Sequence, residues 1–114
     1  MPQNMDRCIE DCGDCAVICS KCAPHCLDMG GEHASREHQN AMHDCAAICG
    51  LAVAYMARGS AHAGHLCGVC AEVCRACAES CGRLAEGDEM MTECARTCER
   101  CARSCEAMAG ASSR

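Results

Sequence analysis

Residues 8–26 read CIEDCGDCAVICSKCAPHC, and their cysteines are separated by steps of 4, 3, 4, 3 and 4 residues. This alternation is the repeat of one face of an α-helix, because successive residues are rotated by about 100°. These cysteines therefore fall within an arc of roughly 80°. In an ordinary amphipathic helix such a stripe consists of large aliphatic residues that face a core. The stretch predicts a helix whose core face consists of thiols.

The same cysteine spacing recurs along the chain and divides it into helical segments. Glycines at Gly30–Gly31, Gly59 and Gly87 follow the periodic segments, as glycine does at helix C-termini. Short connections between helices favour antiparallel neighbours. The predicted fold class is therefore all-α, a single-domain antiparallel up-down-up-down four-helix bundle with a Cys-lined core. The helices are expected at about residues 4–28, 35–57, 61–85 and 88–109.

Several residues predict local features of these helices. Ser35 and Asp88 are the expected N-caps of the second and fourth helices. Pro24 removes one backbone hydrogen bond, which predicts a kink near the end of the first helix. The tail from Gly110 onward is expected to fray. Close approach of helices or subunits would explain the glycines inside helices, which are Gly13, Gly50, Gly68 and Gly82.

The composition excludes several classes of protein. The net charge is −6, the Lys and Arg residues are scattered, and Tyr55 is the single aromatic residue, so no nucleic-acid binding is expected. No apolar run reaches the length of about 18 residues that a membrane span needs. The first residues contain neither an apolar stretch nor a twin-arginine pair, so we expect a cytoplasmic location. No Ser/His/Asp constellation or phosphate loop occurs, and we predict that the protein is not an enzyme.

A disulfide scaffold is an alternative explanation for 17 cysteines. The odd number and the missing export signal disfavour it. Neighbours three or four residues apart on a helix have Cβ atoms about 5–6 Å apart, whereas a disulfide needs about 3.8 Å. Disulfides along one stripe would be strained, and only disulfides between helices remain possible.

Thiolates are soft ligands that suit Cu(I), Zn(II) and iron–sulfur clusters. A structural zinc site needs only four ligands, and an iron–sulfur cluster commonly takes its cysteines from one loop-like run. Cu(I) accepts as few as two sulfur ligands, and one thiolate can bridge two metals, so the ratio approaches one Cu(I) per cysteine. Equal numbers of thiolates and Cu(I) ions also cancel in charge, which avoids a charged interior. The pattern predicts storage of many Cu(I) ions, with a zinc or cadmium thiolate buffer and an iron–sulfur electron carrier as alternatives.

Every cysteine is a candidate metal ligand, and all but one belong to a C-x-x-x-C pair. The pairs are Cys8/Cys12, Cys15/Cys19, Cys22/Cys26, Cys45/Cys49, Cys70/Cys74, Cys77/Cys81, Cys94/Cys98 and Cys101/Cys105, and the remaining cysteine is Cys67.

These pairs make the chain resemble the bacterial copper storage proteins, which are Cys-lined four-helix bundles that bind many Cu(I) ions along the bundle axis. The resemblance covers about residues 4–108. Because no export signal is seen, it is similar to the cytosolic branch of that family, which implies cytosolic storage and buffering of Cu(I). The resemblance also implies a homotetramer. The expected partners are copper ions, further copies of the chain and a copper chaperone.

His38 and Met42 extend the stripe of the second helix backward from Cys45, in steps of 3 and 4. Imidazole and thioether groups both suit Cu(I), so we predict that His38 and Met42 contact the metal. With alternating helix directions, they share one end of the bundle with Cys26, Met29, Cys81 and Met90 or Met91. We interpret this end as the entrance for Cu(I). The other histidines are expected on the surface, off to one side or in a loop, and the opposite end is expected to be an apolar plug formed by Met5, Ala52, Met56, Ala63 and Met108.

Overall fold

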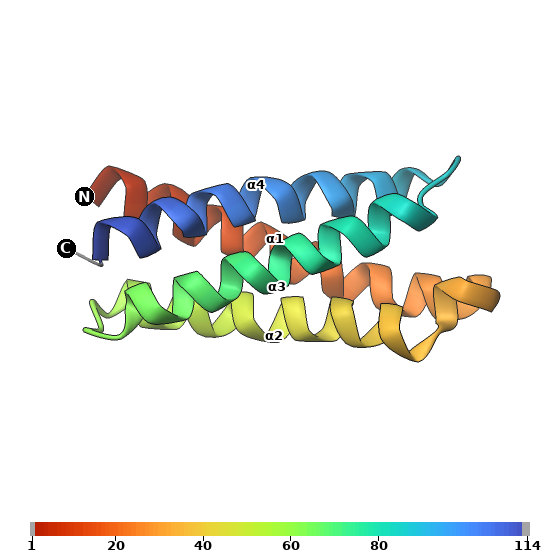
Figure 1. Ribbon diagram of the computed structural model, residues 1–114, viewed down its shortest axis with the longest axis horizontal. Coiled ribbons are helices and arrows are strands. Elements are labelled where there is room, and N and C mark those ends of the chain that lie inside the picture. The colour runs from red at the N-terminus through yellow and green to blue at the C-terminus, as the bar shows by residue number, and fades with distance from the viewer. Residues whose placement is uncertain (1, 113–114) are drawn as a thin grey trace.

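The computed structural model describes residues 2–112 of the chain. The described chain forms four long helices. Figure 1 shows them side by side along one axis, with the start of α1 and the end of α4 at the same end of the molecule. The bundle is elongated and measures 44 × 20 × 18 Å. Its elements are α1 (Pro2–Met29), the short 3-10 helix η1 (Gly31–Ala34), α2 (Arg36–Ala57), α3 (Ala63–Leu84) and α4 (Glu89–Ser112).

Each helix packs against the helix that follows it in the chain, and α4 returns to pack against α1. The helix direction alternates along the chain (Figure 1). This arrangement confirms the predicted all-α, up-down four-helix bundle. Within the described residues, no helix is both long enough and apolar enough to span a bilayer.

Side chains at the starts of α2 and α4 satisfy backbone N–H groups that have no partner within the helix. The Ser35 hydroxyl accepts a hydrogen bond from the His38 backbone N–H at 3.2 Å. The Asp88 carboxylate accepts one from the Met91 backbone N–H at 3.0 Å. Both predicted N-caps are confirmed. The turn between α3 and α4 also needs a left-handed residue, and Gly87 supplies it with φ 74°.

The helices differ from the prediction at three points. The helix α1 continues through Pro24 to Met29, and the kink remains a prediction. The helix α3 begins at Ala63 rather than at residue 61, because residues 59–62 form turns in which Ser60 accepts from the backbone N–H of His62. The helix α4 continues to Ser112, beyond the expected end near residue 109, and fraying of the tail from Gly110 stays a prediction. Residues 113–114 lie outside the described residues.

The glycines inside helices do not mark close contacts between helices in most cases. A methyl group added at Gly13, Gly50 or Gly82 would meet no other atom within 4 Å, so the explanation by close helix approach is wrong for these three. Their backbone faces open space instead. At Gly68 an added methyl group would lie 3.7 Å from the Ala109 Cβ, and this glycine does lie where α3 and α4 meet.

Candidate metal centre

The core of the bundle is made of sulfur. All 17 cysteines are free thiols, and each of them has 0% of its surface exposed. A protonated cysteine packs as a small hydrophobic residue, which explains why a bundle with few large aliphatic side chains can still fill its interior. The absence of bridges among these cysteines removes the disulfide alternative.

The sulfur atoms form a continuous column that runs along the bundle, and each step in it is a contact of 3.5–3.8 Å between two Sγ atoms. It passes through Cys8, Cys105, Cys12, Cys101, Cys49, Cys74, Cys45, Cys15, Cys98, Cys19, Cys94 and Cys81.

Pairs from one helix belong to this arrangement as well. The Sγ atoms of Cys8 and Cys12 lie 3.9 Å apart, and those of Cys70 and Cys74 lie 3.8 Å apart. The C-x-x-x-C spacing therefore brings two thiols of one helix together, and the bundle then adds thiols from the neighbouring helices. A metal ion in the column would be within reach of both kinds of neighbour.

The sulfurs also group in fours. In each group the four Sγ atoms lie within 4.8 Å of one another, and neighbouring groups share cysteines, so that one thiolate can serve two metal ions. One group takes a single cysteine from each of the four helices. The groups are Cys12/Cys49/Cys70/Cys101, Cys15/Cys45/Cys49/Cys74, Cys15/Cys19/Cys45/Cys98 and Cys19/Cys77/Cys94/Cys98.

Contacts between the thiols shift the pKa values of neighbouring cysteines in opposite directions, so that protons stay on part of this core. The contact with Cys15 raises the pKa of the Cys19 thiol, and burial raises it further. The contact with Cys15 likewise raises the pKa of the Cys98 thiol. At the end of the stripe, burial is the main cause that raises the pKa of the Cys26 thiol. Binding of Cu(I) as thiolate complexes must therefore displace protons from the core.

His38 lies beside Cys26, the last cysteine of α1, and is fully buried. Its Nε2 is 3.3 Å from the Cys26 Sγ, and its Nδ1 is 2.6 Å from the Ser80 Oγ. Burial lowers the pKa of His38, and the nearby His33 adds to this effect. A neutral imidazole held by a second partner is the usual form of a metal ligand. The sequence offered no signal for Ser80, which only the packing of α2 against α3 brings to the ring.

Met42 is also fully buried and lies between His38 and Cys45 on α2. Three of the residues expected at this end, namely Cys26, Cys81 and Met91, are fully buried as well. Met29 differs, because 48% of its surface is exposed. It lies at the rim, in the last position of α1.

Polar side chains surround the same end. His25 is half-buried rather than exposed as expected, because its Nε2 pairs with the Asp88 carboxylate at 2.7 Å. This contact with His25 is the main cause that lowers the pKa of Asp88, and the N–H of Met91 adds to it. The ring of His33 lies 3.0 Å from the carbonyl oxygen of Leu84. These contacts tie α1 to the loop between α3 and α4, and η1 to the last residue of α3.

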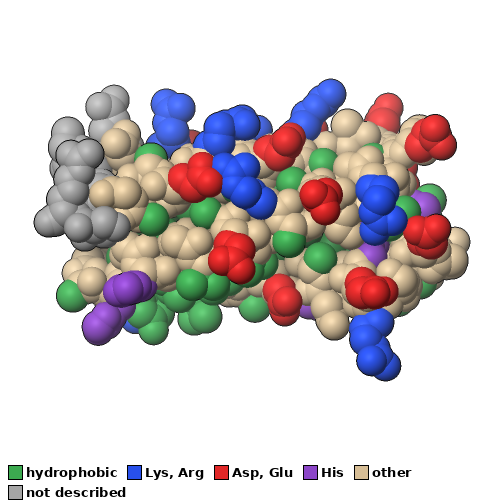
Figure 2. Space-filling view, viewed as in Figure 1, with side chains coloured by type: hydrophobic (Ala, Val, Ile, Leu, Met, Phe, Trp, Pro, Cys, Tyr) green, Lys and Arg blue, Asp and Glu red, His purple; other side chains and the backbone are tan. Residues whose placement is uncertain are grey.

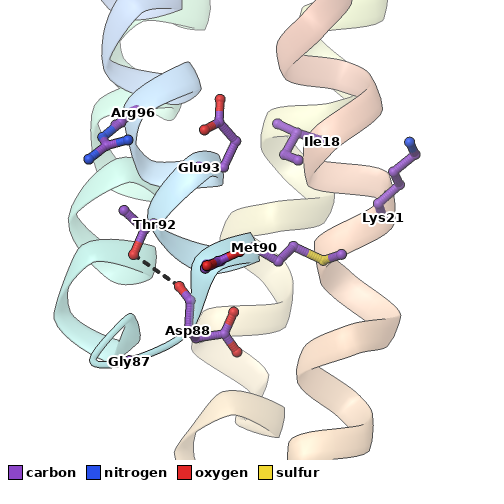
Figure 3. Close-up of a pocket in the computed structure, with 9 residues that line it drawn as sticks. Ile18, Lys21, Gly87, Asp88, Met90, Thr92, Glu93 and Arg96 are labelled. Atoms are coloured by element: carbon purple, nitrogen blue, oxygen red, sulfur yellow. Dashed lines mark hydrogen bonds between the residues drawn. The ribbon is translucent and has the colours of Figure 1, made fainter.

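A surface cavity of about 770 Å³ opens next to Asp88, between α1 and α4. Figure 3 shows Met90 extending from α4 toward α1 in this cavity, and the Thr92 hydroxyl bonded to the Asp88 carbonyl oxygen. The residues that line the cavity include Lys21 and Glu93 but no cysteine. The cavity is therefore separate from the thiol core.

The described residues that are buried at the opposite end of the bundle are apolar. Met56 is 1% exposed and Met108 is 6% exposed. Ala52 on α2 and Ala63 on α3 are buried as well. Met5 is half-buried and packs against the same core. This composition agrees with the expected plug. His43, His62 and His65 are exposed and take no part in the column.

A four-helix bundle with a core of closely spaced thiols defines a class of proteins that bind soft metal ions. The comparison with known families is specific. A family model described as copper storage protein matches residues 1–110. The chain belongs to the copper storage protein family.

Several solved structures are similar over nearly the whole chain. The Nmul_A1745 protein of Nitrosospira multiformis is 42% identical, with a TM-score of 0.91 over 97% of this chain and 99% of that one. The Cu(I)-bound copper storage protein Csp3 of Bacillus subtilis is 34% identical, with a TM-score of 0.84 over 93% and 98%. A cytosolic copper storage protein from Streptomyces lividans, with five coppers, is 29% identical, with a TM-score of 0.82 over 95% and 93%.

The family and the site agree on the chemistry. The protein stores Cu(I), and the cysteine thiolates in the core of its four-helix bundle bind multiple Cu(I) ions. Copper storage proteins are not enzymes, and this chain is a store. The alternatives of a zinc or cadmium buffer and of an iron–sulfur electron carrier give way to Cu(I) storage as its function.

Proposed function

We propose that this chain stores and buffers Cu(I) in the cytosol, with all of its cysteine thiolates as ligands together with His38 and Met42. The single observation that carries the proposal is the continuous column of buried sulfur contacts. Since neighbouring four-sulfur groups share cysteines, bridging thiolates allow close to one Cu(I) per cysteine. The likeness to a cytosolic relative from Streptomyces lividans supports the location.

Titration with Cu(I) tests this proposal. The reduced, metal-free protein is titrated anaerobically, and bound metal is measured against a chromophoric Cu(I) chelator. We expect saturation well above about ten equivalents per chain, because soft bridging thiolates can each serve two Cu(I) ions. Saturation near four equivalents would contradict the bridging arrangement.

The His38 end is the proposed entrance for Cu(I). The imidazole of His38 in its neutral form can bind a soft metal ion. Its Nε2 lies 3.3 Å from the Sγ of Cys26, the last cysteine of α1. Met42 and Met91 provide thioethers at the same end. Such ligands bind Cu(I) more weakly than bridging thiolates, so they can receive the ion and pass it inward. A copper chaperone that delivers Cu(I) would meet this end.

A homotetramer is the proposed assembly. Apolar side chains remain on the outside of the bundle, and Leu51 and Val69 are 51% and 49% exposed. Figure 2 shows hydrophobic side chains gathered along the edge that α2 and α3 form, whereas Lys and Arg side chains line the edge at α4. Burying the apolar edge between copies would remove this surface from water.

A further inference from the structure

We infer that the copper-free protein also binds divalent, tetrahedral metal ions of the Zn(II) class, about two per chain, in its four-sulfur groups. This inference rests on the proposed function, because the same thiolates hold both kinds of metal. The two groups that carry it share no cysteine, and both are fully buried. They are Cys12/Cys49/Cys70/Cys101 and Cys19/Cys77/Cys94/Cys98.

The distances between the sulfurs fit a tetrahedral site. A Zn–S bond of about 2.3 Å places the four sulfurs of a regular tetrahedron about 3.8 Å apart. The Sγ of Cys19 lies 3.8, 3.8 and 3.6 Å from those of Cys77, Cys94 and Cys98. In the other group the contacts Cys12–Cys101, Cys49–Cys70 and Cys49–Cys101 measure 3.5, 3.6 and 3.8 Å. The remaining distances stay within 4.8 Å, so binding needs side-chain movements of about 1 Å at most.

Neighbouring thiols can stabilise the charge of such a site. One Zn(II) with four thiolates carries a charge of −2, which is unfavourable in a dry core unless hydrogen bonds compensate it. The Cys15 thiol donates to the Cys98 sulfur at 3.6 Å, and the Cys81 thiol donates to the Cys94 sulfur at 3.7 Å. Neither Cys15 nor Cys81 belongs to the group Cys19/Cys77/Cys94/Cys98 that receives these hydrogen bonds. They therefore form an outer layer of hydrogen bonds around the metal ligands.

Sharing of cysteines limits the number of divalent ions. The group Cys15/Cys45/Cys49/Cys74 shares Cys49 with the first group, and Cys15/Cys19/Cys45/Cys98 shares Cys19 and Cys98 with the second. Of these four groups, no more than two can be complete at the same time. Each divalent ion takes four thiolates and releases their four protons, whereas Cu(I) can use bridging thiolates and fill the core. Arriving Cu(I) would therefore displace the divalent ions.

The experiment uses Co(II) as the probe, because its visible spectrum separates a tetrahedral thiolate site from the hydrated ion. The reduced, metal-free protein is titrated anaerobically with Co(II). We expect strong visible bands of tetrahedral, thiolate-bound Co(II) that saturate at about two equivalents. Added Zn(II) should remove these bands, and added Cu(I) should remove them as well.

Four single variants, each lacking one thiol, make the test specific to the groups. Cys98→Ser and Cys49→Ser should each lower the Co(II) capacity from about two to about one. Without Cys98, the two groups that remain both need Cys49, and without Cys49, the two groups that remain both need Cys19 and Cys98. Cys101→Ser and Cys26→Ser are the matched controls and should keep a Co(II) capacity of about two. Both variants retain two complete groups that share no cysteine, which are Cys15/Cys45/Cys49/Cys74 and Cys19/Cys77/Cys94/Cys98. All four should lose about the same small share of Cu(I) capacity.

Three outcomes would overturn the inference. One is Co(II) that stays hydrated in its spectrum while Cu(I) binds normally, and this outcome leaves the proposed function intact. Another is a capacity that the four variants change equally. The third is loading with Co(II) far beyond two equivalents. Failure of Cu(I) binding itself would instead contradict the proposed function. Far-ultraviolet circular dichroism of each variant confirms that the bundle is folded.

Discussion

His38 is the residue on which the proposed entrance for Cu(I) depends most. Its ring joins the sulfur of Cys26, the last cysteine of α1, to the hydroxyl of Ser80. The second contact fixes the orientation of the imidazole, as second partners of metal-binding histidines commonly do. Burial lowers the pKa of His38 and so favours its neutral form. When the Nδ1–H of this neutral ring donates a hydrogen bond to the Ser80 hydroxyl, the Nε2 atom that faces Cys26 is free to bind Cu(I).

Replacing His38 and Met42 by Ala removes the proposed ligands at the entrance and should slow loading and unloading of Cu(I) on the order of tenfold, which is what the loss of even an outer partner of a metal ligand typically costs. Total capacity should stay nearly intact, because the thiolates hold most of the metal. Stopped-flow transfer to a chromophoric Cu(I) chelator measures the rate.

The matched control replaces Met56 and Met108, which are buried at the opposite end. This variant should lose about 2–5 kcal/mol of unfolding free energy for each truncated methionine and keep the transfer rate. If only the control variant changes the rate, Cu(I) enters at the other end.

At the scale of the element, one side chain at the start of α4, that of Asp88, makes two stabilising interactions. The Asp88 carboxylate caps the helix through the Met91 N–H and pairs with His25 on α1. Cap residues typically contribute about 1 kcal/mol. We expect Asp88→Ala to lower the free energy of unfolding by about that amount or somewhat more, and Asp88→Asn to retain the cap and lose only the charge.

The effect of Asp88 should depend on pH. Its pKa is lower in the folded protein than the ordinary value of 3.8, mainly because of His25. A lowered pKa means that the contribution to stability is fully present above about pH 4 and is lost as the pH falls through the folded pKa. Urea unfolding of the wild type and of Asp88→Ala between pH 7 and pH 2 should therefore give curves that converge at the acid end. A constant difference would show that the charge of Asp88 does not contribute.

At the scale of the whole molecule, the bundle should fold without metal. Protonated thiols can pack as small apolar groups, and contacts between them already fill the interior. Far-ultraviolet circular dichroism of the reduced, metal-free protein should show a largely helical spectrum that changes little when Cu(I) is added. A coil spectrum that becomes helical only with metal would mean that metal binding supplies the folding free energy, as in zinc fingers.

The outer surface makes a second prediction at this scale. Leu51 is half-exposed on α2, and a charge placed there would be unfavourable in an interface between copies. Leu51→Glu should shift the proposed tetramer toward smaller species in sedimentation equilibrium. Lys21→Glu is the control, because Lys21 lies at the α1–α4 cavity. An unchanged mass in the Leu51 variant would place the interface elsewhere.

The sequence by itself determined the helices and the chemistry of the core. Cysteine steps of 3 and 4 place all thiols of a helix on one face, and a chain with few other apolar residues has to bury that face. The bundle, the N-caps Ser35 and Asp88, and the storage of Cu(I) follow from this pattern. So does the position of His38 and Met42 on the stripe of the second helix, because helical phase is a local property.

Only the tertiary structure decided which thiols of different helices meet. Periodicity fixes the phase of each helix but not its height relative to the next, so it could not group Cys12 with Cys49, Cys70 and Cys101. For the same reason the contact of Ser80 with His38 and the pairing of His25 with Asp88 were not visible beforehand. Each joins residues far apart in the chain, and such contacts depend on how whole helices pack rather than on any local signal.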